Sequence, residues 1–206
     1  LPGPVWGEAE RARVFTLLRA TARPGGISVI SGSQPPGVPV DFPAQLAASM
    51  PESRIVLDTS GSTLTEAVRH PIPGLEVLRM DGPEGEELAG KPLPTLSDTA
   101  EFAQSLVRRG VAKTVIVARG AEGNVLADKD QKLFAKAAKV RVKSTVGAGD
   151  SFVAAFVLAL AQGQTNAEAL ALGSAAASAA VTTDATQLCR PEDVMRLLRE
   201  CTVSAV

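Results

Sequence analysis

The sequence predicts an α/β fold in which a mostly parallel sheet is covered by helices on both faces. Short runs rich in β-branched residues alternate along the chain with longer runs that have helical spacing. Glycine-rich turns (SGSQPPG, DTSG and RGAEG) follow these short runs directly. The chain has 206 residues, 45% hydrophobic and 21% charged, which is enough for one domain with a sizeable core or for most of a larger domain.

Four apolar runs have the composition of strands that are buried on both faces of a sheet. These strands are predicted at 27–31, 54–58, 75–79 and 113–118. Before and between them, helical spacing predicts helices over 8–20, 41–49, 63–68 and 97–110. Asp41 and Ser97 are the predicted helix caps, and Gly110 is the predicted stop.

The pattern changes after Ala118. Short extended runs with turn residues between them predict further strands at one edge of the sheet, over 124–128, 132–135 and 139–142. Helices are then predicted from about 149, over 166–181, and from 191 to about 200. No internal repeat, low-complexity tract or linker divides the sequence, so residues 1–206 are predicted to form one domain.

Composition excludes several classes of protein. A formal net charge of −1 offers no positive patch to nucleic acid or an anionic membrane, and aromatic residues make up only 3%. Glycine, glutamine or serine interrupts every long apolar stretch, so no membrane span is predicted. Cys189 and Cys201 match no metal or disulfide framework, and we expect a cytoplasmic protein. Because the first residue is Leu1 and no signal peptide follows, we expect a chain that begins inside something larger or has been processed.

Two glycines and a carboxylate stand directly before a predicted helix in VGAGDSF, residues 146–152. One reading is a helix start with Asp150 in its first turn, where the helix dipole favours an anion. The other reading is an anion hole, in which the amides of Gly147, Ala148 and Gly149 hold a transferring phosphoryl group. Asp150 would then accept the proton of the attacking hydroxyl. These four residues alone favour the structural reading and leave both open.

Other turns carry weaker signals. Consecutive prolines in SGSQPPG fix a rigid loop that would present Ser33 to a sugar or phosphate oxygen, although an ordinary strand-to-helix crossover is the simpler reading. RGAEG, residues 119–123, fits either a loop under a nucleotide phosphate or a hairpin turn. His70 is expected to be solvated, and Asp58 to cap the turn that follows it.

A helix of small residues, ALALGSAAASAAVTT at 169–183, also has two readings. Close packing against the sheet is the favoured one. Small side chains would equally leave room for a flat adenine beside Ser174 and Ser178.

The combination of motifs is more specific than its parts. SGSQPPG, LDTSG, STVGAGDSF and SAAASAAVTTDATQLC, in this order and spacing, resemble the PfkB (ribokinase-like) family of sugar kinases. The resemblance runs from LPGP to the last helix, and STVGAGDSF nearly completes the family signature. The TQLC ending is most similar to the 6-phosphofructokinase branch. The resemblance implies a ribokinase-like α/β fold, represented here by its C-terminal, nucleotide-binding part.

The resemblance also implies an activity. The implied reaction is the transfer of a phosphoryl group from ATP to a phosphorylated ketohexose. The first choice of substrate is fructose 6-phosphate, which would be converted to fructose 1,6-bisphosphate. The implied cofactors are Mg²⁺ and K⁺. Two alternatives stay open: a 1-phosphofructokinase or tagatose-6-phosphate kinase, and a non-catalytic nucleotide-binding fragment. A full-length protein would be a homodimer, with a sugar phosphate and ATP as its small-molecule partners.

Site residues are carried over by position. Asp150 corresponds to the catalytic base, the amides of 147–149 to the anion hole, and Glu84 to a residue that organises Mg²⁺ through water. Gly32 and Ser33, with Asp150, correspond to the sugar-contacting positions. The residues that match the nucleotide site are Asp81, Ala118, Arg119, Gly120, Ala121, Glu122, Gly123, Ser174 and Ser178. The residues that match a K⁺ site are Ser144, Val146, Ala180, Thr183, Ala185 and Gln187.

Three departures from the family pattern stand out. The Lys-Pro-Asn-x-x-Glu motif reads RMDGPE here, so Asp81 puts a carboxylate where the family has an amide, beside the expected phosphates. Ala118 replaces a frequent serine. The family's N-terminal portion, with its lid and diglycine sugar motif, is absent from this sequence.

Overall fold

Seven strands of the described chain form one sheet, and they lie side by side in sequence order. The computed structural model describes residues 3–184 and 187–206. β1 to β4 are parallel, whereas β5, β6 and β7 add to the β4 edge in antiparallel fashion. The strands are β1 (Ile27–Ser31), β2 (Arg54–Asp58), β3 (Val77–Asp81), β4 (Thr114–Ala118), β5 (Gly123–Ala127), β6 (Lys132–Lys136) and β7 (Val203–Ala205).

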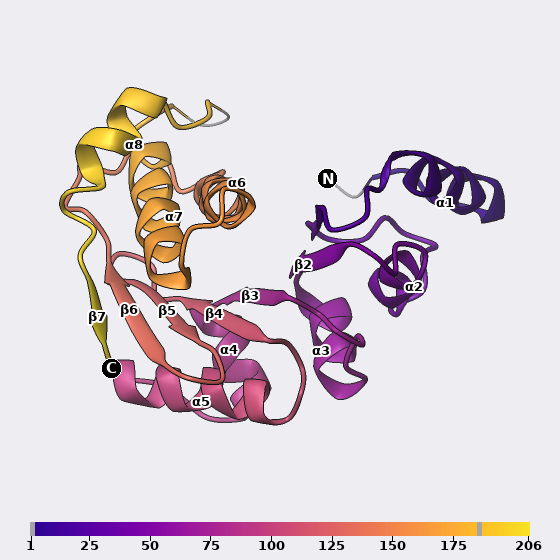
Figure 1. Ribbon diagram of the computed structural model, residues 1–206, viewed down its shortest axis with the longest axis horizontal. Helices are drawn as coiled ribbons and strands as arrows, with labels where there is room; N and C mark the ends of the chain where they lie inside the picture. The colour runs from indigo at the N-terminus through magenta and orange to yellow at the C-terminus, as the bar shows by residue number, and fades with distance from the viewer. Residues whose placement is uncertain (1–2, 185–186) are drawn as a thin grey trace.

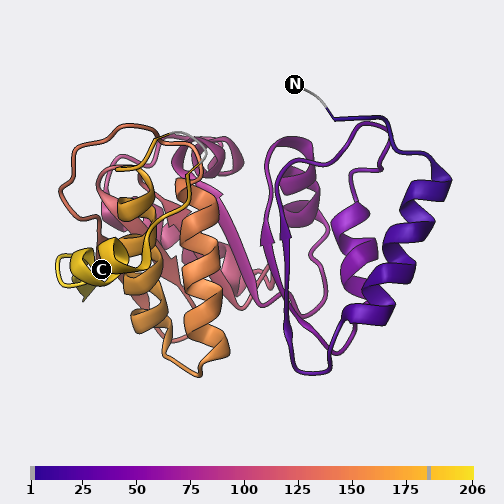
Figure 2. The same cartoon turned by 90° about the horizontal axis from the view of Figure 1, so that it is seen from above.

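Helices cover both faces of this sheet. The helices are α1 (Glu8–Thr21), α2 (Phe42–Ala48), α3 (Gly61–Arg69), α4 (Gly82–Ala89), α5 (Leu96–Arg108), α6 (Ala148–Ala161), α7 (Asn166–Ala180) and α8 (Pro191–Leu197). Figure 1 shows α4 and α5 below the sheet and α6, α7 and α8 above it. From above, α1 and α2 lie at the opposite end of the molecule from α7 and α8 (Figure 2). Within the described ranges, no helix is both long and apolar enough to cross a membrane.

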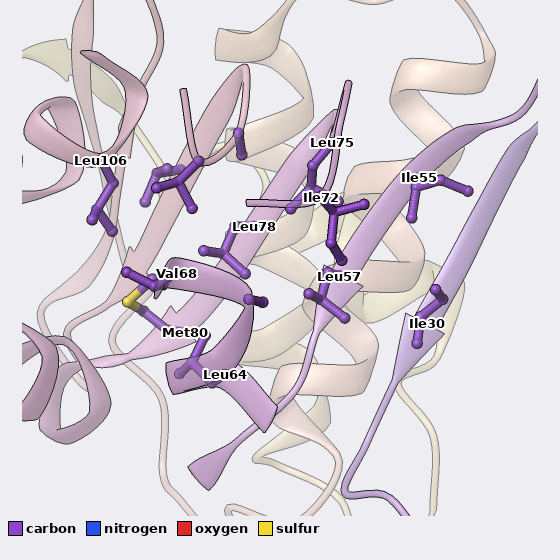
Figure 3. Packing of buried hydrophobic residues seen from close by; sticks show 14 of the residues in the cluster. Ile30, Ile55, Leu57, Leu64, Val68, Ile72, Leu75, Leu78, Met80 and Leu106 are labelled. Atoms are coloured by element: carbon purple, nitrogen blue, oxygen red, sulfur yellow. The ribbon is translucent and has the colours of Figure 1, made fainter. Parts of the chain in front are cut away.

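The core has two layers, because successive strand residues point to opposite faces of the sheet. Leu57 and Leu78 belong to the cluster that packs against α2, α3 and α5. Figure 3 shows this layer, with Leu64 of α3 beside Met80 of β3. The adjacent residues Val56 and Val77 belong to the second cluster, under α6 and α7. The alternating burial fixes the register of the central strands and therefore where their carboxyl ends lie.

The predicted strand at 139–142 is wrong. The chain leaves the sheet after β6, where the Ala138 amide donates to Ser178 Oγ of α7 at 3.2 Å and Val140 packs against the α7–α8 cluster. The edge position beside β6 is taken instead by β7, whose Val203 pairs with Ala135. Alternation in KVRV predicts an exposed strand, but it cannot show which segment reaches the edge first.

Two predicted helix features also differ from the structure. Helix α5 is capped by Thr95, whose hydroxyl accepts from the Asp98 amide at 3.1 Å, so Ser97 lies inside the first turn. Helix α4 was not predicted, because Gly82, Pro83 and Gly85 read as a turn.

Helix α4 begins with a reciprocal capping box. Asp81 Oδ1 accepts from the Glu84 amide at 2.9 Å, and Glu84 Oε2 accepts from the Asp81 amide at 2.8 Å. Aspartate and asparagine are about equally good at this position, since both offer a side-chain oxygen to the free amides of the first turn. The change from the family's amide to Asp81 therefore preserves the start of α4.

Replacing Asp81 tests this capping role. Asp81→Ala should lower the free energy of unfolding by about 1 kcal/mol, whereas Asp81→Asn should change it by only a few tenths. Urea denaturation of both variants measures the difference. Equal losses in the two variants would mean that the negative charge, and not the acceptor oxygen, holds the start of α4.

Gly123, where β5 begins, should not tolerate a side chain. Its φ is 138°, and an added Cβ would overlap the carbonyl oxygen of Ala135 and lie 2.9 Å from the Ala137 amide nitrogen. Gly123→Ala should cost about 2–3 kcal/mol of unfolding free energy. The matched control is Gly90→Ala, which has a φ of 66° but open space around the Cβ and should cost about 1 kcal/mol. Equal costs for the two would show that the β5–β6 pair can shift.

Candidate active site

A cavity of about 620 Å³ opens between the sheet, the start of α6 and one face of α7. Its floor includes Arg79 and Ala118, which lie at or near the carboxyl ends of β3 and β4. Residues 137–142, which leave the sheet, form one wall. In sheets with parallel strands, ligands bind beyond these carboxyl ends, and the volume suits a small molecule.

The loop before α6 has the geometry of an anion site. Gly147 is the N-cap of α6 in the left-handed conformation, with φ 80° and ψ 0°. The Ser151 amide makes the first helical bond, to Gly147 O at 2.9 Å. The amides of Gly149 and Asp150 precede that bond and so have no helical partner, whereas the Ala148 amide is directed at Thr145 O, 3.3 Å away. The helix dipole and these free amides favour a negatively charged ligand.

Arg79 lies directly against this loop. A Cβ on Gly149 would be 3.1 Å from Arg79 Nη1, so only glycine leaves the guanidinium this much room. Arg79 Nη1 also donates to Asp58 Oδ1 at 3.1 Å, and both side chains are largely buried. Asp58 therefore holds a cation beneath the anion loop, and its predicted role as a turn cap is wrong.

Several carboxylates surround this ion pair. Burial raises the pKa of Asp58; Arg79 opposes the increase, while the nearby carboxylates Asp150 and Asp81 add to it. Burial likewise raises the pKa of Glu84, against its hydrogen bond from the Asp81 backbone, and the charge of Asp81 adds to the increase. The Asp150 side chain is exposed at the rim of the site. A second cation would relieve the repulsion among these groups.

Whether the site can hold Mg²⁺ depends on the Glu84 carboxylate. Its Oε2 is used in the capping box, and no hydrogen bond to Oε1 is formed within the described part of the chain. Residues 3–184 and 187–206 contain no cluster of three or more metal-ligating side chains. The site therefore fits an ion that keeps its waters and its phosphate ligands, as Mg²⁺ commonly does.

The predicted nucleotide loop divides into two parts. Ala118, Gly120 and Ala121 line the cavity. The Arg119 side chain turns away, donating to the carbonyl oxygens of Leu93, Pro94 and Thr95 and to Glu122. Arg119 and Glu122 thus tie the loop to the segment before α5, and Gly123 allows β5 to start.

Ser174 and Ser178 of α7 both line the cavity and are buried. Ser178 Oγ has no hydrogen left for a ligand, since it donates to Ser174 O at 2.8 Å, and it also accepts from the Ala138 amide. Ser174 Oγ instead accepts from Asn124 Nδ2 of β5, 2.9 Å away. The small residues of α7 therefore pack closely against the sheet, and they also form one wall of the cavity.

The predicted sugar-contacting residues lie outside this cavity, beyond β1. The Gly32 amide donates to Asp58 O at 2.9 Å, and Thr59 Oγ1 donates to Gly32 O, so the loop after β1 is fixed to the loop after β2. The Ser33 side chain is exposed.

The residues matched to a K⁺ site come from two adjoining loops. The Lys143 and Ser144 amides donate to Val181 O, and the single hydroxyl hydrogen of Thr183 is within reach of both Ala180 O at 2.8 Å and Gln187 O at 2.9 Å. Val146 donates its amide to Ser144 Oγ. Ala185 lies outside the described residues.

Sequence reasoning missed Arg79, Asn124 and Lys139 as cavity residues. Arg79 lies inside an apolar strand, and two signals could have marked it: a charge in such a run, and its place at the lysine of the Lys-Pro-Asn-x-x-Glu motif. Asn124 and Lys139 were assigned only to strands. The solitary His70 is exposed, as expected, and hydrogen-bonds to Glu66 at 2.8 Å.

Known proteins share this sequence pattern. Residues 6–193 match the family described as pfkB family carbohydrate kinase. The ATP-dependent 6-phosphofructokinase isozyme 2 of Escherichia coli K12 is 36% identical over 175 residues, or 84% of this chain and 56% of that protein. A 1-phosphofructokinase of Xanthomonas campestris pv. campestris is 35% identical over 171 residues, or 82% of this chain and 54% of that protein.

The fold is shared as well. The crystal structure of phosphofructokinase-2 from Escherichia coli in complex with potassium matches with a TM-score of 0.89 at 32% identity, over 97% of this chain and 64% of that one. This confirms the predicted ribokinase-like α/β fold. The chain spans little more than half the length of the curated relatives it matches. Because the family match covers most of the sequence, the chain belongs to the pfkB family of carbohydrate kinases.

Proposed function

We propose that this chain supplies the nucleotide site and the catalytic base of an ATP-dependent sugar-phosphate kinase. The observation that carries the proposal is the meeting of three features at one point. These are the free amides of Gly149 and Asp150, the exposed Asp150 carboxylate, and the Arg79 guanidinium beneath the loop. Together they offer a place for a transferring phosphoryl group and a proton acceptor beside it.

The reaction follows from these roles. A sugar hydroxyl oxygen attacks the γ-phosphorus of ATP, and its proton passes to the Asp150 carboxylate. The bond from the γ-phosphorus to the bridging oxygen breaks, and ADP leaves. The free amides of Gly149 and Asp150, together with Arg79, stabilise the charge on the transferring group, and Gly147 allows the turn that directs these amides toward it. The transition state is loose, so positioning and charge matter more than the strength of the base.

The cavity would hold the nucleotide. Ala118, Gly120 and Ala121 leave backbone exposed for phosphates, and the apolar wall between the 137–142 segment and α7 suits an adenine ring. Glu84 would organise Mg²⁺ through water, and Mg²⁺ when bound neutralises phosphate charge. The adjoining segments at 143–146 and 180–184, together with Gln187, would hold K⁺.

The sugar substrate is a narrower proposal. Fructose 6-phosphate is the first choice because the TQLC ending resembles the 6-phosphofructokinase branch. Fructose 1-phosphate is the alternative, since the relatives include a 6-phosphofructokinase and a 1-phosphofructokinase. Gly32 and Ser33 would contact the sugar. A cytoplasmic homodimer is proposed for the whole protein.

An assay of ADP release separates the alternatives. The chain is incubated with ATP, Mg²⁺ and K⁺, and with fructose 6-phosphate, fructose 1-phosphate or tagatose 6-phosphate in turn. Faster ADP release with one sugar identifies the substrate. ATP binding without any turnover would instead support a non-catalytic nucleotide-binding chain, and absence of both would contradict the proposal.

Asp150→Asn tests the base. The amide keeps the shape and the helix start but cannot accept a proton, so turnover should fall about 10²–10⁴-fold while ATP affinity changes little. The control is Asp130→Asn, an exposed carboxylate in the β5–β6 turn that should leave both unchanged. Near-normal turnover in Asp150→Asn would return this residue to a structural role at the start of α6.

Ser33→Ala tests the sugar side of the site. Loss of one neutral hydrogen bond should cost about 0.5–1.5 kcal/mol, so the KM for the sugar phosphate should rise about 2–12-fold while the KM for ATP stays the same. Steady-state kinetics with each substrate varied measures both constants. Equal changes in the two constants would indicate a distorted loop and not a lost sugar contact.

A further inference from the structure

Asn124 is a buried polar side chain in the wall of the cavity. It is 7% exposed, and it lies on β5 opposite Ala118 of the nucleotide loop. Its Nδ2 donates to Ser174 Oγ of α7 at 2.9 Å, and Ser174 is 1% exposed. This hydrogen bond joins the sheet to the small-residue helix across the end of the cavity.

The bond leaves one acceptor and one donor unused. Within the described residues, no hydrogen bond reaches Asn124 Oδ1, and Ser174 Oγ donates none. A hydroxyl that accepts from an amide still has its own proton to donate. Asn124 Oδ1 is not among the fully buried polar atoms that lack a partner in the described chain, so this oxygen keeps access to the cavity that Asn124 lines, where a ligand can donate to it.

The surroundings make the pair selective. Ala121, Ala138 and Ala177 line the same part of the cavity, and their methyl groups offer no competing hydrogen bond. Ser178 has no hydrogen left to donate, because its hydroxyl already donates to Ser174 O while it accepts from the Ala138 amide. A flat base between the sheet and α7 would therefore meet the Asn124 acceptor next to the Ser174 donor.

Adenine carries the complementary pair of groups. Its exocyclic amino group is a donor beside a ring nitrogen that is an acceptor, whereas guanine has a carbonyl oxygen in place of the amino group. We propose that Asn124 and Ser174 together select adenine in the nucleotide site. Oδ1 of Asn124 accepts from the exocyclic amino group, and Ser174 Oγ donates to N1, the adjacent ring nitrogen, which carries a hydrogen in inosine and guanine and so cannot accept there. This rests on the proposed function, because it requires a nucleotide in the cavity.

Nucleotide affinity tests the pair directly. The full 206-residue chain is titrated by calorimetry with ATP, GTP and inosine triphosphate, the last of which differs from ATP at the amino position. The wild-type chain should prefer ATP about tenfold or more. Asn124→Ala should weaken ATP binding about 2–12-fold, the range expected for one neutral hydrogen bond, and leave inosine triphosphate nearly unchanged. Ser174→Ala should act in the same direction.

Two features of the design keep the result clear. The ratio of ATP to inosine triphosphate affinity within one preparation does not depend on the fraction of folded protein. The control is Asn166→Ala, which removes a comparable asparagine hydrogen bond, from Nδ2 to Asp128 at 2.8 Å, and should leave the ratio unchanged.

Each outcome decides a different point. A ratio that falls toward one in both cavity variants but not in the control supports the proposal. Wild-type binding of all three nucleotides with equal affinity, or an unchanged ratio in Asn124→Ala and Ser174→Ala, overturns adenine selection alone. Absence of binding by any nucleotide overturns the nucleotide site itself and the proposed function with it.

Discussion

The ion pair between Arg79 and Asp58 is the contact on which the site depends. It joins the carboxyl end of β2 to β3, and it places the guanidinium against Gly149, where the chain turns into α6. Removing a charge pair from water is costly, and it is tolerated only where the geometry is good and the remaining polar atoms find partners. The Nε of Arg79 is buried with no partner in the described structure, so the pair is incompletely satisfied. Such a group is more readily explained by what it does for a ligand than by stability alone.

This contact links three distant stretches of sequence. DTSG provides the carboxylate, RMDGPE the guanidinium and GAGD the glycine that leaves room for it. The parallel register brings them together, because Asp58 pairs with Arg79 and Asp81 pairs with Ala118 along the same edge. The sheet thus sets the spacing of the charged groups before any ligand is present.

Most strands could be predicted from the sequence because their β-branched runs are buried on both faces. β1 and β2 match the predicted ranges, whereas β3 starts two residues later than predicted. The local sequence pattern gave a wrong prediction where two segments compete for the same edge of the sheet, as residues 139–142 and β7 do beside β6. It failed for α4 because the capping box of Asp81 and Glu84 overrides the poor helix propensity of the glycines and proline. Short-range signals identified the GAGD loop, yet Arg79 and Asn124 acquire their roles only through partners 21 and 50 residues away.

One edge of the sheet has a consequence of its own. β1 pairs only with β2 among the described strands, and Val29 on it is 43% exposed. A strand with one neighbour presents free amides and carbonyls along its other side, so a further strand can pair there. Such an addition would continue the row of carboxyl-end loops past Ser33, on the far side from the cavity beside α7. Strands added next to β1 can therefore bring new ligand-contacting loops to this edge of the sheet. The loop at 147–149 and Arg79, which supports it, would not have to change.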